Sequence, residues 1–127
     1  MKRRFRLTRS TDIKRVRRSG KSYAHPLVVL YVLKSDRPGV QVGVSAGLSV
    51  GNAVRRNRAK RLLRAAMNEL LPQTVTGRCP ELGETVEGFD LLLIARSPLP
   101  DSNLQQTRTA LTSLLERAGL LSQAHDG

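Results

Sequence analysis

The side chains with the clearest chemical potential in this sequence are basic, and they gather in residues 51–64. The segment reads GNAVRRNRAKRLLR and holds six basic residues and no acidic one. Its pattern is typical of the start of a helix, on which like charges four residues apart repel each other. Arg56, Lys60 and Arg64 would form one row of that helix. A polyanion lying against the row is the simplest explanation for a repulsion that no Glu or Asp relieves.

Basic residues are also unevenly distributed along the whole chain. The net charge is +12 over 127 residues; residues 1–64 hold 18 Lys and Arg against two Asp, whereas residues 65–127 hold four Arg against eight acidic residues. Sixteen of the 22 basic residues lie in residues 1–21 and 51–64. This distribution indicates nucleic acid as the first candidate partner and an anionic membrane as the second, with the C-terminal half as scaffold.

Other residue types offer little chemistry. Neither His25 nor His125 has a Cys or a carboxylate at metal-ligand spacing. The single cysteine, Cys79, excludes an internal disulfide and fits a reducing cytoplasm. Gly20–Ser22 is similar to the end of a phosphate-binding loop, but Arg15 stands where that loop needs its first Gly. We therefore expect no catalytic group, metal or cofactor held by the chain itself.

The elements that must position the basic row are expected to form a single α+β domain over residues 1–127, a two-layer sandwich of a sheet and helices. In chain order they are a basic arm at 1–9, a helix at 10–19, strands at 27–33 and 40–46, a helix at 53–71, a surface loop at 72–88, a strand at 89–95, a helix ended by Gly119, and a flexible tail at 120–127. The short link between the first two strands predicts a hairpin. No apolar run approaches the ~20 residues of a membrane span.

Local signals define the helices more closely. The expected N-caps are Ser10 or Thr11, then Asn52, then Asp101 or Ser102. On the central helix, a helical wheel places a set of polar residues opposite the apolar face: Arg56, Asn57, Lys60, Arg61 and Arg64. The same wheel puts Arg58 at the boundary and predicts that Arg55 overhangs the helix start.

The string at 51–64 closely resembles the signature of the bacterial ribonuclease P protein subunit. The hallmark of that signature is an Arg-Asn-Arg core, here Arg56–Arg58, followed by Lys60, Arg61 and a Leu-rich helix. Further segments are similar to the family in the same order: Leu7–Gly20, Leu27–Leu33, Val42–Ser45 and Asp90–Pro98. The resemblance covers roughly residues 4–118.

The resemblance implies one protein bound to one large catalytic RNA, in a complex that removes the 5′ leader from precursor tRNA. The RNA would hold Mg²⁺ and perform the hydrolysis, so the chain would be the non-catalytic subunit of a cytoplasmic endoribonuclease. No membrane and no small-molecule substrate would be involved. The implied fold is that of ribosomal protein S5 domain 2, with a mixed central sheet and a left-handed βαβ crossover.

Carried over by position, the resemblance also assigns site residues. The expected contacts to the catalytic RNA are Asn52, Arg55, Arg56, Asn57, Arg58, Lys60, Arg61 and Arg64. The expected cleft for the single-stranded leader, between the first helix and the sheet, involves Ile13, Arg17, Arg18, Lys21 and Tyr31. The chain departs from the family at Ile13 and Arg17, where Phe is common, so this cleft would rely more on charge than on aromatic stacking. It departs again at Leu48 and Ser49, where Lys is frequent.

Two alternative functions remain open at this point. A ribosomal or other structural RNA-binding protein with a similar sandwich would bind RNA without processing tRNA. A DNA-binding regulator could place the basic helix in a major groove, but it would need a helix-turn-helix and usually a dimer, whereas strands flank this helix.

Overall fold

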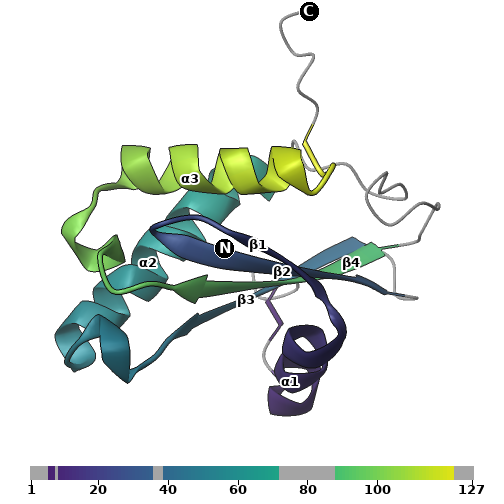
Figure 1. Ribbon diagram of the computed structural model, residues 1–127, viewed down its shortest axis with the longest axis horizontal. Coiled ribbons are helices and arrows are strands. Elements are labelled where there is room, and N and C mark those ends of the chain that lie inside the picture. Colours follow the sequence, from purple (N-terminus) through teal and green to yellow (C-terminus); the bar gives the residue numbers. More distant parts are fainter. Residues whose placement is uncertain (1–5, 8, 36–38, 72–87, 122–127) are drawn as a thin grey trace, which may run out of the picture.

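The computed structural model describes residues 6, 7, 9–35, 39–71 and 88–121. Its elements, shown in Figure 1, are helices α1 (Ser10–Ser19), α2 (Ala53–Leu70) and α3 (Leu104–Arg117), strands β1 (Lys21–Ala24), β2 (Val28–Ser35), β3 (Gly39–Ala46) and β4 (Gly88–Ala95), and the short 3₁₀ turns η2 (Leu48–Val50) and η5 (Leu99–Asp101). The expected α+β class is confirmed, with helices on both faces of one mixed sheet.

The order of strands in the sheet is β1-β2-β4-β3. β4 pairs antiparallel with β2, with Leu30 opposite Leu93, and parallel with β3, with Val44 opposite Leu93. The hairpin predicted between the strands at 27–33 and 40–46 is therefore wrong, because β4 lies between these strands, which are β2 and β3. The reason is burial: FDLLLIA is apolar along almost its whole length and is buried at nearly every position, which suits a central strand better than β3, where Gln41 and Ser45 alternate with valines.

The parallel pair of β3 and β4 is connected by α2, since neighbouring parallel strands need a long crossover. α2 and α3 pack against each other and cover one face of the sheet, as Figure 1 shows. The main core lies between these helices and the sheet, and Leu is its commonest residue; Leu63, Met67, Phe89 and Leu111 are fully buried. The left-handed sense of the crossover stays an expectation from the resemblance.

The opposite face of the sheet carries α1 (Figure 1). A second, smaller cluster forms there from Leu7, Val16 and Leu92. α1 ends at Ser19, as the sequence predicted, and Gly20 follows in an extended conformation. A Cβ at Gly20 would lie 2.5 Å from the carbonyl oxygen of Val16, so only glycine fits there without a shift. The helix is joined to the sheet by Arg15, whose Nη2 lies 2.7 Å from an oxygen of Asp90.

Several local predictions need correction. α1 begins after Arg9 with no side-chain cap, so neither Ser10 nor Thr11 caps it. α3 is capped by Asn103, which forms a capping box with Gln106; Asp101 and Ser102 are instead taken up by the end of η5. The cap of α2 by Asn52 is confirmed.

The predicted arm, loop and tail lie largely outside the described residues. Within the described parts, Leu7 of the arm is buried and its N–H donates to Val42 O at 2.8 Å. Gly88, assigned to the loop, begins β4. Leu120 and Leu121, assigned to the flexible tail, are 0% and 8% exposed, so these two residues belong to the core instead.

Candidate nucleic-acid interface

The start of α2 is fixed by Gly51 and Asn52. The side chain of Asn52 accepts a hydrogen bond from Arg55 N at 3.0 Å, which satisfies one of the free N–H groups of the first turn. Gly51 has a φ of 132°, and a Cβ there would lie 2.7 Å from Arg55 Cδ. Glycine therefore lets the backbone turn sharply and leaves room for the Arg55 side chain to fold back beneath the helix.

Arg55 is bound mainly by other groups of the protein, although its side chain is 38% exposed. Its Nε donates to Val50 O at 2.9 Å, and its two terminal nitrogens donate to the Asp101 carboxylate at 2.9 and 3.0 Å. Nη2 also donates to Ser97 O at 3.3 Å. The hydrogen bond and the charge of Arg55 hold the pKa of Asp101 below its usual value, and Asp101 in turn raises the pKa of Arg55. The expectation that Arg55 overhangs the helix start is confirmed.

Arg58 lies on the same flank of α2. Its Nε donates to Pro100 O at 2.7 Å and its Nη2 donates to Ser102 O at 3.1 Å. Both arginines thus contact the connection between β4 and α3, residues 96–103. The sequence predicts no partner within the protein for either side chain, and the resemblance assigns both to the catalytic RNA.

Arg56, Lys60 and Arg64 lie on another flank of α2 and are half-buried. The wheel had placed them opposite the apolar face, but only Asn57 and Arg61 of the predicted set are fully exposed. The three side chains are half-buried because their flank of α2 borders the face that packs against the protein. Apart from a hydrogen bond from Arg56 Nη1 to Gly51 O at 2.7 Å, the row is not tied to the protein through any side-chain bond that the described residues show.

The row on α2 meets the N-terminal segment at Arg64. Arg6 forms a parallel bridge with Val42, which places it along the free edge of β3. Burial lowers the pKa of Arg64, and the nearby charge of Arg6 lowers it further. The two basic segments of the sequence therefore converge at this edge. Among the described residues, no carboxylate forms an ion pair with Lys60, Arg61 or Arg64.

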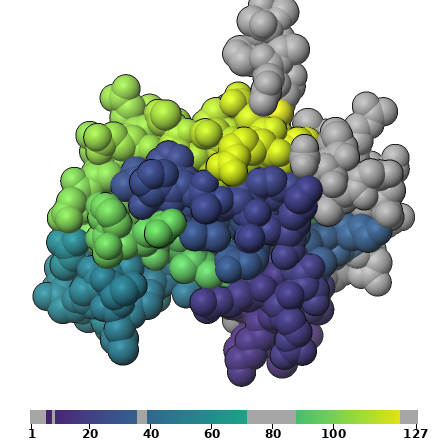
Figure 2. Space-filling model, viewed as in Figure 1, coloured from purple at the N-terminus to yellow at the C-terminus, as the bar shows by residue number. Residues whose placement is uncertain are grey.

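Of the residues predicted to line the leader cleft, some are brought together between α1 and the sheet. Ile13 and Tyr31 both pack against the cluster of Leu7, Val16 and Leu92. Arg17 and Arg18 are exposed in the last turn of α1; Arg17 lies one turn beyond Ile13 on the same side of the helix, whereas Arg18 lies on the side opposite the buried Val16. Figure 2 shows α1 and the first half of α2 projecting from one side of the molecule, with residues of other elements visible between them.

Lys21 does not join this group. Side chains alternate between faces along a strand, and β1 places Lys21 on the same face as Tyr23, whose ring lies in the main core beneath α3. Lys21 Nζ is 5.7 Å from the centre of that ring. Tyr31, by contrast, lies opposite Ser22 in the β1–β2 register, on the α1 face. The structure thus places Lys21 away from Ile13 and Tyr31, and its assignment to the leader cleft stays a prediction.

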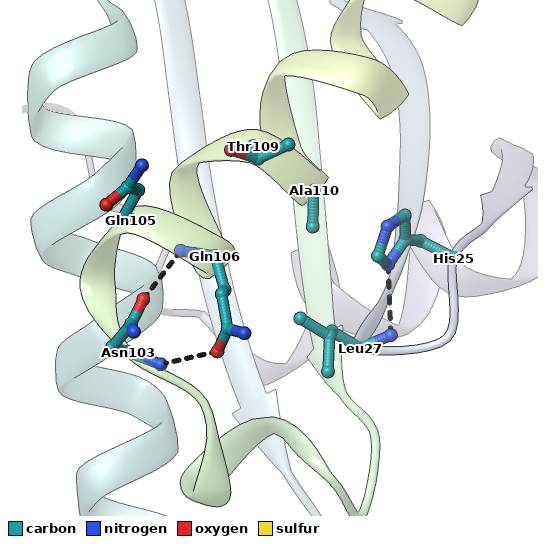
Figure 3. A pocket seen from close by; sticks show the side chains of 7 residues that line it. All are labelled: His25, Leu27, Asn103, Gln105, Gln106, Thr109 and Ala110. Carbon is teal, nitrogen blue, oxygen red and sulfur yellow. Dashed lines mark hydrogen bonds between the residues drawn. The ribbon is translucent and has the colours of Figure 1, made fainter.

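A separate hollow lies between the β1–β2 turn and the start of α3 (Figure 3). His25 lines it, but His25 Nδ1 accepts from Leu27 N at 3.0 Å, and Asn103 and Gln106 cap each other in the same wall. These polar groups hold the turn and the helix start. Within the described ranges no three His, Cys, Asp or Glu residues cluster as a metal site would, and no described helix is long and apolar enough to cross a membrane. Cys79 and His125 lie outside those ranges.

Comparison with known proteins shows the family to which this chain belongs. A model of the family described as Ribonuclease P matches residues 1–119. The chain belongs to the ribonuclease P protein family. The ribonuclease P protein component of Clostridium botulinum is 33% identical, over 97% of this chain and 95% of the relative. That of Clostridium novyi is 34% identical, over 94% of this chain and 98% of the relative.

Solved structures of ribonuclease P proteins share the fold. The protein from Staphylococcus aureus superposes with a TM-score of 0.75 at 24% identity, covering 93% of this chain and 98% of that one. The protein from Thermotoga maritima gives 0.71 at 24% identity, covering 88% and 96%. The family resemblance of the signature is thus confirmed, and membership in the ribonuclease P family supports a role as an RNA-binding subunit in tRNA processing, associated with an endoribonuclease.

Proposed function

We propose that the chain binds the catalytic RNA of ribonuclease P through α2 and Arg6, and that it binds the 5′ leader of precursor tRNA on the sheet face beside α1. In this proposal the RNA holds Mg²⁺ and cuts the leader, and one protein serves each RNA in the cytoplasm. The chain itself contributes phosphate binding and the positioning of a single strand.

The observation that supports the RNA contact most strongly is the convergence of Arg6 with Arg64. Arg64 is partly buried next to the positive charge of Arg6, both of which lower its pKa, and no described carboxylate forms an ion pair with it; this arrangement is unfavourable for the protein alone. The two guanidinium groups are well arranged for phosphate oxygens, which guanidinium groups bind in pairs. Lys60 and Arg56 continue the same line toward the start of α2.

The leader contact is supported by the half-covered face beside α1. Ile13 and Tyr31 provide a partly exposed apolar surface, and Arg17 lies one turn of α1 beyond Ile13 on the same side of the helix. Single-stranded nucleic acid binds where bases can lie on aromatic or apolar side chains while the backbone contacts nearby cations. Tyr31 is the one aromatic residue of the predicted cleft set.

Reconstitution of cleavage tests the proposal. A bacterial ribonuclease P RNA is mixed with labelled precursor tRNA at low Mg²⁺, where RNA alone cuts poorly, and the rate of leader removal is measured with and without the protein. We expect the wild-type protein to restore cleavage. The exposed Arg61→Gln variant should restore less. The control Arg108→Gln, which removes a partly exposed Arg of α3 that pairs with Glu69 near the C-terminal end of α2, should act as wild type.

Two results would contradict the proposal. One is the absence of any rescue across several bacterial RNAs by protein that circular dichroism shows to be folded. The other is leader cleavage by the purified protein after all RNA has been digested.

A further inference from the structure

Resting on the proposed RNA contact, we propose that Arg55 and Arg58 are positioning residues: they fasten residues 97–102 to α2 and thereby hold the RNA-binding row in place, without contacting RNA phosphates themselves. The basic signature would then have two flanks with different tasks. Arg56, Lys60 and Arg64 face the RNA from one flank, and Arg55 and Arg58 face the protein from the other.

The donor count of Arg55 carries the first step. A guanidinium has five N–H groups, and four hydrogen bonds leave Arg55 for Val50 O, Ser97 O and both oxygens of Asp101. At most one N–H is left for a phosphate. The Asp101 carboxylate also cancels the charge of Arg55 at 2.9 Å, so the pair adds almost nothing to the attraction of a polyanion.

Arg58 supplies the second step, because it ends on the same segment. Pro100 O and Ser102 O accept its two hydrogen bonds, and they flank the last residue of η5. Pro100 and Ser102 both precede α3, so their carbonyl oxygens are not paired within that helix. An Arg58 that turned toward RNA would leave both of them without this donor.

The segment is fastened from its other side as well. Ser102 Oγ donates to Leu99 O at 2.7 Å and lies 3.3 Å from Thr107 Oγ1, both within the protein interior. Residues 97–102 are therefore held between α3, through Ser102, and α2, through the two arginines. Such a double attachment fixes the first turns of α2 relative to β4, and with them the direction in which Arg56 and Lys60 point.

Two matched pairs of variants separate positioning from contact. In Arg55→Gln and Arg55→Lys the forked hydrogen-bond geometry is lost, but only Lys keeps the charge. Arg61→Gln and Arg61→Lys make the same changes at an exposed position that bonds to none of the described residues. The affinity of each folded protein for a labelled ribonuclease P RNA is measured from 50 to 200 mM salt, well below its melting temperature.

We expect Arg55→Gln and Arg55→Lys to bind several-fold more weakly than wild type, to a similar extent, with the slope of log K against log salt unchanged. Arg61→Gln should reduce the slope by about 0.7–0.9, the value of one phosphate contact, and Arg61→Lys should preserve it. Arg58→Gln should behave like the Arg55 variants.

A slope reduced by Arg55→Gln and restored by Arg55→Lys would overturn the proposal, because it would show direct phosphate contact. Unchanged affinity and slope in both Arg55 variants would also overturn it, because the arginine would then serve the fold alone. Failure of the underlying function looks different: the wild-type protein itself would not bind the RNA, and the Arg61 variants would be indistinguishable from it.

Discussion

Arg15 of α1 reaches across to Asp90 in the centre of the sheet, with 2.7 Å between Nη2 and the carboxylate oxygen. Asp90 is 1% exposed, whereas the Arg15 side chain is 43% exposed. The pair joins the only described helix on that face to the most buried strand, and the hydrogen bond to Asp90 raises the pKa of Arg15. This contact therefore ties α1 to the sheet beside the proposed leader-binding surface.

Removing the buried charge should therefore loosen α1. We expect Asp90→Asn to lower the free energy of unfolding by about 1–3 kcal/mol, less than a fully buried pair would lose because Arg15 is partly in water. Asp12→Asn removes the weaker partner of Arg15, at 3.4 Å, and should cost less than about 0.5 kcal/mol. Urea unfolding of both variants measures the difference, and equal losses would show that Asp90 has no special role.

The elements that the sequence predicted best are those set by local signals. α2 follows from its apolar period and from Asn52, and both act within a few residues of the chain. β1 was missed because four mostly exposed residues carry almost no apolar pattern. The place of β4 between β2 and β3 was missed because strand order depends on contacts across the whole chain, although the continuous apolar run FDLLLIA is typical of a central strand.

The candidate site likewise has one part that the sequence predicts and another that only the fold shows. The basic row could be predicted because its residues are neighbours on one helix. The partners of Arg55 and Arg58 lie more than 40 residues further along the chain, in a segment that was interpreted as a helix cap. An Asp at position 101 would suit a helix cap as well as an ion pair. Only the folded arrangement shows that the Asp101 carboxylate faces Arg55.

The stability that Asp101 provides should depend on pH. Arg55 holds the pKa of Asp101 below its ordinary value of 3.8, so the pair stabilises the fold above that pH, and this contribution disappears as the pH falls through the lowered pKa. We expect the melting temperature of wild type to exceed that of Asp101→Asn by a constant amount above pH 5, and the gap to close below pH 4. A gap that persists at pH 2 would mean that charge is not what Asp101 contributes.

Gly51 and Gly47 form a natural comparison at the entrance to α2. A Cβ at Gly51 would meet Arg55 Cδ at 2.7 Å in a backbone conformation that other residues rarely adopt, whereas a Cβ at Gly47 would meet nothing within 4 Å. We expect Gly51→Ala to lower the free energy of unfolding by about 1–3 kcal/mol and Gly47→Ala to change it by less than about 0.5 kcal/mol. Thermal melts of both variants test this, and a harmless Gly51→Ala would show that Arg55 adopts another position freely.

A substitution at Ile13 should strengthen the binding of the leader. Ile13 packs beside the same cluster as Tyr31, and a larger aromatic ring there would give a leader base a second surface on which to stack. We expect Ile13→Phe to improve binding of precursor tRNA by the holoenzyme by up to about 1–3 kcal/mol. Mature tRNA, which has no leader, is the control, and an equal gain for both tRNAs would place the effect outside leader binding.

Lys21 and Arg17 carry the same charge but lie on different sides of the sheet, and this difference can be measured. Arg17 is exposed in the last turn of α1, beside the surface of Ile13 and Tyr31, whereas Lys21 lies with Tyr23 on the α3 side. We expect Arg17→Gln to weaken the binding of precursor tRNA relative to mature tRNA several-fold and to reduce its salt dependence, because one phosphate contact is lost. Lys21→Gln should leave that ratio unchanged. If Lys21→Gln reduced the ratio as much as Arg17→Gln, the leader would have to pass around the β1 edge to reach both charges, and the surface beside α1 alone would not define its path.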